Sequence, residues 1–410
     1  MAEIRAVEQY VHDKFSGLRN NVDAGEFALD DLEVALNVDI NDGRVLQRRK
    51  GFGAAVVAGS YHSLWSGAGM CVAASGTELK KIAADYSTTT IRTGISAGRP
   101  LSYYAIGSRA YYSNGVDTGV LENGASRSWG LQVPPRITAT AISGTLRAGR
   151  YQYTITYLRS DGQESGAPQA GVLELSVPGG LRFSNLPVSS DSGVAYKTIY
   201  VSAWNGTTMY QRALVANTVT SVDVVEDGLL TLPLATQELG PPPAGQIVSS
   251  YNGRMLVASG NVLSYSEPYS YELFDLRANL PLESEITLVA PVTGGVFVGT
   301  INGTIYLQGD DMARVNFVPK ADYGVIPGTL AMVQADTLGE GSQNGSAFIW
   351  ASRQGLCVGT DNGGFRNLTQ ERFSYPATDR GAGLVRRHRG MNQYLAVLQG
   401  STVEAANIHQ

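Results

Sequence analysis

Residues 295–306 read Gly-Val-Phe-Val-Gly-Thr-Ile-Asn-Gly-Thr-Ile-Tyr, which is two apolar runs on either side of an Asn-Gly pair. Short apolar runs joined by Asn-Gly predict a tight β-hairpin. Looser copies begin at residues 69, 109, 254 and 355, so the five starts are separated by 40, 145, 41 and 60 residues. Spacings near 40 match the period of the four-stranded blades of β-propellers. We therefore predict propeller-like sheets, with a further partial blade at residues 392–400.

The 145-residue interval between the second and third copies carries a different pattern. After Pro134-Pro135, longer alternating runs such as 151–157 and 195–201 are separated by turn signals, until the interval ends at residues 240–243, Gly-Pro-Pro-Pro. Roughly seven short strands in about 105 residues is the strand count of a small β-sandwich. We expect residues 134–240 to form such a sandwich, inserted between two blades.

The predicted fold class is therefore all-β: a β-propeller-like domain with an inserted immunoglobulin/fibronectin-III-like β-sandwich and a short N-terminal arm. Within the arm, Asp30–Leu36 permits one or two helical turns, and Asp42-Gly43-Arg44 predicts a tight turn. The expected organisation is residues 1–52 as the arm and first strands, 53–133 as the first part of the propeller, 134–240 as the sandwich, and 241–410 as the second part of the propeller.

Composition agrees with a chain of short strands and tight turns. Gly makes up 48 of 410 residues and charged residues only 16%, whereas about 25% is usual. The net charge of −5 gives no basic footprint for nucleic acid, and the cationic run Arg386–Arg389 is predicted to be a solvated surface. No apolar stretch approaches the roughly 18 residues of a membrane span, and the acidic residues in 1–15 predict no signal peptide. We expect a soluble protein made in a reducing cytoplasm.

Few residues are arranged as an active site would arrange them. Cys71 and Cys357 fall at corresponding points of two hairpin copies, which predicts buried packing positions. The four histidines, His12, His62, His388 and His409, form no two-histidine metal motif. Residues 37–43 resemble a calcium loop, but Asp42 and Arg48 stand where Gly and Glu are needed. The sequence therefore assigns no catalytic, cofactor-binding or metal-binding residue, and it predicts a protein that is not an enzyme and has no cofactor.

Two alternatives to a structural role stay open. A glycosidase needs a pair of carboxylates, and Asp310 and Asp311 are available, although no spacing singles out a pair. A carbohydrate- or receptor-binding propeller for host recognition would use exposed aromatic rings, for which the grouped Tyr103-Tyr104 and Tyr111-Tyr112 are candidates. Ordinary cross-strand pairing is the favoured interpretation of these four tyrosines.

Several short motifs resemble virion proteins of tailed bacteriophages. Residues 15–21, 32–39 and 43–52 are similar to the opening of these proteins, with a Gly-hydrophobic-Asn phrase followed by Ala-x-Asn-Val and Gly-x-Leu-x-Arg-x-Gly segments. Residues 252–275 and Gly309-Asp310-Asp311 are also similar. The family resembled is the propeller-bearing tail hub or nozzle (tail tubular) protein of short-tailed phages.

This resemblance implies a structural protein of the viral tail, assembled in the host cytoplasm and carried in the virion. It implies a homo-oligomeric ring, usually a hexamer, below the portal and the head-tail adaptor, in contact with other tail proteins and tail fibres. DNA would pass through the lumen of this head-tail connection during ejection, without sequence-specific binding. A mildly acidic lumen would let DNA slide, because phosphate binding requires clustered Lys and Arg. The resemblance implies no membrane span.

Overall fold

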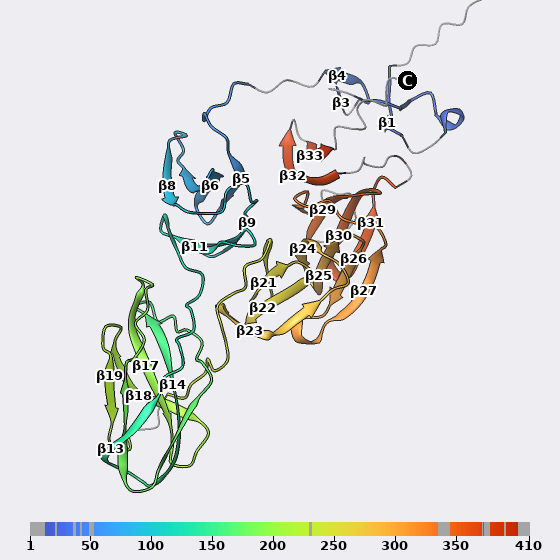
Figure 1. Cartoon of the computed structure of the whole chain (residues 1–410). Helices are drawn as coiled ribbons and strands as arrows, with labels where there is room; N and C mark the ends of the chain where they lie inside the picture. Colours follow the sequence, from blue (N-terminus) through green and yellow to red (C-terminus); the bar gives the residue numbers. More distant parts are fainter. Residues whose placement is uncertain are drawn as a thin grey trace, which may run out of the picture. The chain divides into compact units, whose positions relative to one another are not determined.

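The computed structural model of the chain describes residues 13–20, 23–35, 38–41, 43–48, 53–228, 232–334, 345–370, 372, 378–388 and 391–400. Regular structure within these ranges consists of β-strands and short 3₁₀ turns, with no α-helix (Figure 1). The chain is therefore all-β, as its glycine content and low charge predicted. Among the described residues, no helix is long and apolar enough to cross a membrane.

Four-stranded sheets, in which the strands follow one another in chain order, recur along the described part of the chain. The first contains β5 (His62–Gly67), β6 (Met70–Ser75), β7 (Glu78–Ile82) and β8 (Thr88–Arg92). The second contains β9 (Ser102–Ile106), β10 (Arg109–Ser113), β11 (Thr118–Glu122) and β12 (Ala125–Arg127). The third contains β20 (Ile247–Tyr251), β21 (Arg254–Ser259), β22 (Val262–Glu267) and β23 (Ser270–Pro281).

Two more sheets of the same kind follow. The fourth contains β24 (Ile286–Val292), β25 (Gly295–Thr300), β26 (Thr304–Gln308) and β27 (Asn316–Ala321). The fifth contains β28 (Ala331–Gln334), β29 (Ser346–Ser352), β30 (Gly355–Thr360) and β31 (Gly364–Asn367). In all five sheets the second and third strands pair as an antiparallel hairpin. Four strands in chain order are the architecture of propeller blades, so the propeller-like prediction is confirmed.

Glycine at the hairpin turns explains part of the unusual composition. Gly76 and Gly260 turn the first and third hairpins with φ of 59° and 58°, and a Cβ at either position would meet no atom within 4 Å. Left-handed backbone, rather than lack of space, therefore selects glycine at these two turns.

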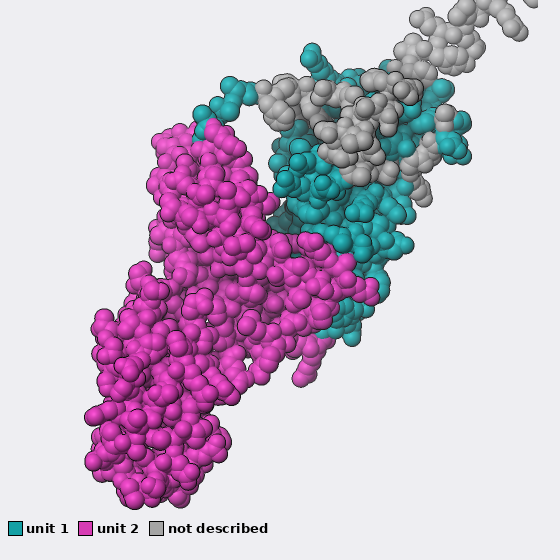
Figure 2. Space-filling view, in the orientation of Figure 1, with its two compact units in different colours: residues 1–58, 287–310, 315–410 teal, residues 59–286, 311–314 magenta. Residues whose placement is uncertain are grey.

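One compact unit contains residues 59–286 and 311–314, and thus the first three sheets (Figure 2). Successive side chains along β10 point to opposite faces of the second sheet, and both faces are buried at this strand. Tyr112 lies in a buried cluster shared with Val72 and Leu79 of the first sheet. Its neighbour Tyr111 lies in a cluster shared with the third sheet. Apolar side chains between successive sheets therefore hold this unit together.

The other compact unit contains residues 1–58, 287–310 and 315–410 (Figure 2). Phe297 of β25 packs against Trp350 of β29, with ring centroids 5.9 Å apart, in a core shared by the fourth and fifth sheets. The predicted partial blade at 392–400 belongs to a two-stranded sheet of β32 (Thr378–His388) and β33 (Met391–Gly400). Tyr394 of this hairpin packs on the fifth sheet, and its hydroxyl donates to the Thr329 carbonyl at 2.6 Å.

The described N-terminal segments form two small sheets and no α-helix. A parallel pair joins β1 (Gly17–Leu18) to β2 (Asp31–Leu32), and an antiparallel pair joins β3 (Val38–Ile40) to β4 (Leu46–Arg48). The predicted tight turn is present, since the Arg44 amide donates to the Asn41 carbonyl at 2.8 Å. The sequence permitted one or two helical turns at residues 30–36, but the described part of this segment, residues 30–35, contains no helix. Asp31 instead lies in β2 and accepts hydrogen bonds from Ser16 and Arg19, which favours pairing with β1.

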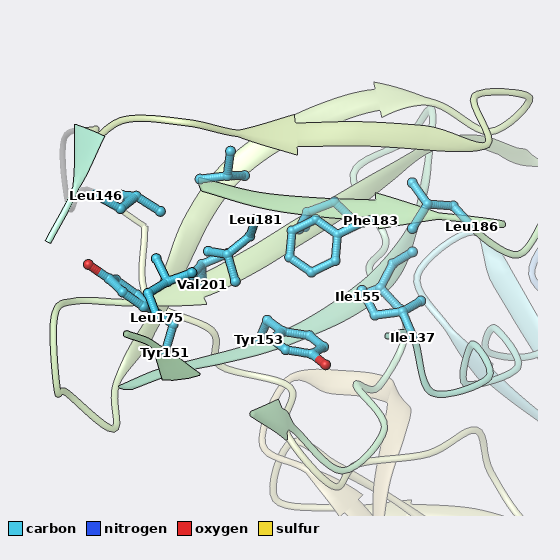
Figure 3. Packing of buried hydrophobic residues seen from close by; sticks show 12 residues of the cluster. Ile137, Leu146, Tyr151, Tyr153, Ile155, Leu175, Leu181, Phe183, Leu186 and Val201 are labelled. Carbon is cyan, nitrogen blue, oxygen red and sulfur yellow. The ribbon is translucent and has the colours of Figure 1, made fainter. Parts of the chain in front are cut away.

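The interval predicted as an insert contains two sheets. One has the order β13 (Ala139–Leu146), β16 (Gly179–Ser184), β19 (Ser221–Val224). The other has the order β15 (Gly171–Leu175), β14 (Gly149–Arg159), β17 (Val194–Ser202), β18 (Met209–Ala216). Their inner faces share one core, in which Tyr153 and Phe183 meet edge to face at 5.2 Å (Figure 3). The immunoglobulin/fibronectin-III-like assignment of this two-sheet insert stays a prediction.

The second face of the larger insert sheet carries a buried polar layer. The Glu164 carboxylate accepts hydrogen bonds from Thr156 of β14 at 2.5 Å and from Tyr200 of β17 at 2.8 Å. Residues 164–165 pair with the end of β14 and residues 232–234 pair with β18, and the Thr154 hydroxyl donates to the Pro168 carbonyl. Burial of these hydroxyls is tolerated because each of the three has an acceptor.

Both connections of the insert are hydrogen-bonded to β23 of the third sheet. On the entry side, Trp129 Nε1 donates to the Tyr271 carbonyl at 2.9 Å. On the exit side, Gly240 and Phe274 exchange two backbone hydrogen bonds of 2.9 Å. The two compact units divide the chain after residues 58, 286, 310 and 314, and the predicted borders at 52, 133 and 240 stay predictions.

Candidate functional site

The two cysteines do not occupy equivalent positions. Cys71 lies on the second strand of its sheet, whereas Cys357 lies on the third. The fifth sequence copy was matched one strand too late, because its second strand is β29, which starts at Ser346. Both cysteines still lie on inner strands, and Cys357 is fully buried, with its Sγ 3.4 Å from the Ser352 hydroxyl. Burial raises the pKa of the Cys357 thiol, so a packing role fits it better than nucleophilic chemistry.

The grouped tyrosines pair across strands, as the favoured interpretation predicted. Tyr111 lies opposite Tyr104, and Tyr112 lies opposite Tyr103, on the hairpin of β9 and β10. Tyr111 and Tyr112 are almost completely buried, at 1% and 0% exposure. Tyr111 and Tyr112 are therefore not available to stack on a sugar ring, and the hypothesis of a sugar-binding surface is wrong for these two residues.

The other residues singled out in the sequence are dispersed. Asp311 forms an ion pair with Arg254 at 3.7 Å, and Arg386 is exposed and bonded to Gln393. His62 Nδ1 lies 2.9 Å from the Ser63 hydroxyl. No group of three or more His, Cys, Asp or Glu residues that could hold a metal was found in the described part of the chain. His12, His409, Arg389, Asn37 and Asp42 lie outside the described residues.

A cavity of about 890 Å³ opens between the second sheet and the two-sheet insert, within one compact unit. Its blade-side wall comes from Arg92, from Thr118 of β11, and from the segment 126–135 that leads into the insert. Its insert-side wall comes from Tyr157 and Arg159 of β14 and from the loop 187–193, which reads Pro-Val-Ser-Ser-Asp-Ser-Gly. We call this loop the serine loop.

The serine loop is fixed by side chains that lie behind it. Lys197, which is fully buried on β17, donates from Nζ to the Pro187 carbonyl at 2.7 Å. The Asn217 side-chain amide bonds both the amide and the carbonyl of Ser189, each at 3.0 Å. Asp191 Oδ1 accepts from the Gly193 amide at 2.9 Å, which closes the turn. These bonds fix the backbone of the loop before any ligand arrives.

An ion pair joins the serine loop to β14, the strand that forms the rest of the insert-side wall. Arg159 Nη2 donates to Asp191 Oδ2 at 2.8 Å, and the Ser128 hydroxyl donates to the same oxygen at 2.7 Å. Burial alone would raise the pKa of Asp191. The hydrogen bonds from Ser128 and Gly193, together with the Arg159 charge, outweigh that effect and hold the pKa below its ordinary value. Asp191 is therefore an ionised acceptor at neutral pH.

Each arginine of the cavity wall has a carboxylate close by. Arg92 Nη2 lies 3.8 Å from Asp117, and Arg127 Nε lies 3.3 Å from Glu122. Together with the pair of Arg159 and Asp191, this means that a nearby carboxylate balances the charge of each of the three arginines. The cavity is therefore polar without being strongly positive.

Two nitrogen donors at the cavity have no hydrogen-bond acceptor. Arg159 Nε and Arg127 Nη2 are both buried and make no hydrogen bond to any described residue, although Arg127 Nη2 lies 3.9 Å from Asp161 and 4.0 Å from Glu272. A buried donor without an acceptor costs about 1–3 kcal/mol. Neither nitrogen is accessible to solvent, so both lie behind the wall of the cavity. No single sequence motif could reveal this site, because its residues come from five separate segments.

No protein-family model matches the chain, and no curated protein matches it. Among solved structures, the chain is similar to the N-terminal part of BBS1 in a complex with ARL6 (12% identity, 80% of this chain and 85% of that chain, TM-score 0.33). It is also similar to the N-terminal domain of Nup159 (10%, 80% and 70%, TM-score 0.30) and to AztD from Citrobacter koseri (12%, 84% and 90%, TM-score 0.27). These TM-scores carry no argument about this chain, whose propeller-like description stands on its own sheets.

Proposed function

We propose that the chain is a structural protein of a bacteriophage tail. It forms a homo-oligomeric ring, a hexamer at the hub or nozzle position, below the portal and the head-tail adaptor. In this role it is carried in the virion, contacts other tail proteins and tail fibres, and acts mechanically rather than as an enzyme.

The observation that carries this proposal is the recurrence of four-stranded sheets packed face to face through buried side chains. Tyr111, Tyr112, Phe297 and Trp350 are inter-sheet contacts of this kind and are nearly inaccessible to solvent. A closely packed interior deforms little under load, which suits a ring that retains and releases pressurised DNA. The similarity of residues 15–52 and 252–275 to short-tailed-phage proteins supports the same role.

The lumen of the proposed ring is a passage and not a binding groove. The chain carries a net charge of −5, so clustered positive charge does not dominate it. Because DNA affinity rises with the number of phosphates neutralised by Lys and Arg, such a chain lets the duplex slide.

Virion composition and particle imaging test the proposal. Mass spectrometry of purified phage particles should detect the chain at a small fixed copy number, a multiple of six for a hexamer. Electron microscopy of the purified chain mixed with its adaptor should show rings. A chain that stays monomeric with the adaptor and is absent from washed virions would overturn the role.

A further inference from the structure

We propose that the cavity between the second sheet and the two-sheet insert binds an uncharged oligosaccharide. The serine loop, the Arg159–Asp191 pair and Gln132 provide its polar wall. This activity goes beyond the proposed mechanical role and does not depend on it.

The size and the rigidity of the cavity suit a small ligand. A volume of about 890 Å³ falls in the range of roughly 300–1,000 Å³ that is typical of ligand pockets. Most loops are mobile, but the serine loop is held by Lys197 and Asn217 from behind and by Arg159 from the side. A pre-fixed wall lowers the entropy that binding a ligand would cost.

The charge balance of the wall selects the chemical class. An anionic ligand requires uncompensated cations, yet Arg92, Arg127 and Arg159 each have a carboxylate within 4 Å. An apolar ligand would cover serine hydroxyls and guanidinium groups without giving them partners, which is unfavourable. An uncharged ligand rich in hydroxyl groups avoids both penalties.

A sugar also matches the mixture of donors and acceptors in the wall. Its hydroxyl groups can accept from Ser190 and Ser192 and donate to the ionised Asp191. Val188 and Pro135 add apolar surface to the lining, against which the C–H face of a sugar ring can pack. Ser190, Ser192, Gln132 and Val188 are all solvent-exposed at the cavity.

Two arginines of the wall each leave one buried donor without an acceptor. Arg159 has only 4% of its side chain exposed, lines the cavity, and leaves Nε without a partner. Arg127 lines the same cavity and leaves Nη2 without a hydrogen bond. Both nitrogens are inaccessible to solvent, so they lie behind the wall, and contacts with a ligand are left to the exposed groups of Ser190, Ser192 and Gln132.

An oligosaccharide array followed by titration calorimetry tests the proposal. The purified full chain is first applied to an array of defined neutral and acidic oligosaccharides from bacterial surface polysaccharides. The best-bound neutral oligosaccharide is then titrated into the wild-type chain and into Ser190→Trp, Gln132→Ala and Ser221→Trp. Ser221→Trp is the matched control, because Ser221 is an exposed serine on β19 that does not line the cavity.

We expect Ser190→Trp to weaken binding at least tenfold by placing a bulky side chain in the cavity, and Gln132→Ala to weaken it severalfold. Ser221→Trp should bind like the wild type, and all three variants should keep the wild-type circular-dichroism spectrum. Failure to bind any neutral oligosaccharide, equal binding by Ser190→Trp, or binding of sodium sulfate or acidic glycans alone would each overturn the proposal. These results leave the tail role untouched, because virion incorporation is measured separately.

Discussion

Arg159 and Asp191 form an ion pair of 2.8 Å in which the arginine side chain is only 4% exposed and the aspartate side chain 22%. The two residues lie on β14 and on the serine loop, so the pair ties a core strand of the insert to a wall of the cavity. An arginine buried this deeply depends on its carboxylate, since breaking such a pair leaves a desolvated charge uncompensated.

Asp191→Asn should destabilise the chain by about 3 kcal/mol, because it leaves Arg159 buried without a charged partner. Urea unfolding monitored by tryptophan fluorescence measures this loss. Asp85→Asn is the matched control, since Asp85 is exposed and bonds the amide and hydroxyl of Ser87, two residues away, and it should change stability by less than about 0.5 kcal/mol. Equal stability of the two variants would contradict the expectation.

The same pair gives a pH dependence at the acid end. The pKa of Asp191 is lowered in the folded chain, so the folded state binds fewer protons than the unfolded state near pH 4. Its stabilising contribution is therefore present above the ordinary pKa of 3.8 and is lost as the pH falls through the folded-state value. Unfolding free energies measured from pH 6 to pH 3 should fall less steeply for Asp191→Asn than for the wild type.

Gly166→Ala should destabilise the insert, because an added Cβ would lie 1.6 Å from the Leu239 carbonyl oxygen. That atom is backbone and cannot rotate away, so we expect a loss of at least about 2 kcal/mol in the free energy of unfolding. Thermal unfolding reports the loss as a lowered Tm. Gly240→Ala serves as the control, since nothing lies within 4 Å of its Cβ position and its φ is not left-handed. A Gly166→Ala chain as stable as Gly240→Ala would show that residues 166 and 239 are not in contact.

Cys357 should resist thiol reagents in the folded chain, because its side chain is fully buried and burial raises its pKa. In a Cys71→Ser variant, Ellman's reagent should detect no thiol under native conditions and one thiol after denaturation. The partly buried Cys71 should react in a Cys357→Ser variant without denaturant. Fast native labelling of Cys357 would contradict its burial between the fourth and fifth sheets.

Alkaline solutions should destabilise the fold through its buried tyrosines. Burial is the main cause that raises the pKa of Tyr323 to about 12, and it also raises the pKa values of Tyr103, Tyr111 and Tyr200. Above pH 10 the unfolded chain loses phenolic protons that the folded chain keeps, so each such tyrosine removes up to about 1.4 kcal/mol per pH unit. Absorbance at 295 nm should show part of the 21 tyrosines ionising only on unfolding. Complete native ionisation with a midpoint near pH 10 would contradict this.

The hairpins were predictable because their signal is local. Two apolar runs around a small turn mark a strand pair wherever it occurs, and all five sequence copies coincide with paired strands. The same simplicity caused the one-strand error at Gly355, because any neighbouring pair of strands in a sheet fits the pattern. Tertiary pairing with β1 also overrode the helical tendency of Asp30–Leu36, which no local rule could anticipate.

The cavity could not be predicted from the sequence, for a different reason. Arg92, Arg127, Arg159 and Asp191 come together only when the insert is folded against the second sheet, and each residue taken alone has the pattern of a solvated charge. The grouped tyrosines did not mark a binding surface, since Tyr111 and Tyr112 are buried in the interior. The proposed tail role rests on short motifs. It also requires an assembly of several chains, which the sequence of one chain does not describe.

The two attachments of the insert to β23 have a mechanical consequence. A pull on the insert loads the Trp129–Tyr271 bond and the paired bonds of Gly240 and Phe274 at the same strand. A force applied at the far end of the insert is therefore delivered to β23, whose partner β22 anchors it in the third sheet. The third sheet therefore takes load from both connections of the insert, alongside β12 of the second sheet, whose Arg127 donates to Gln163 of the insert.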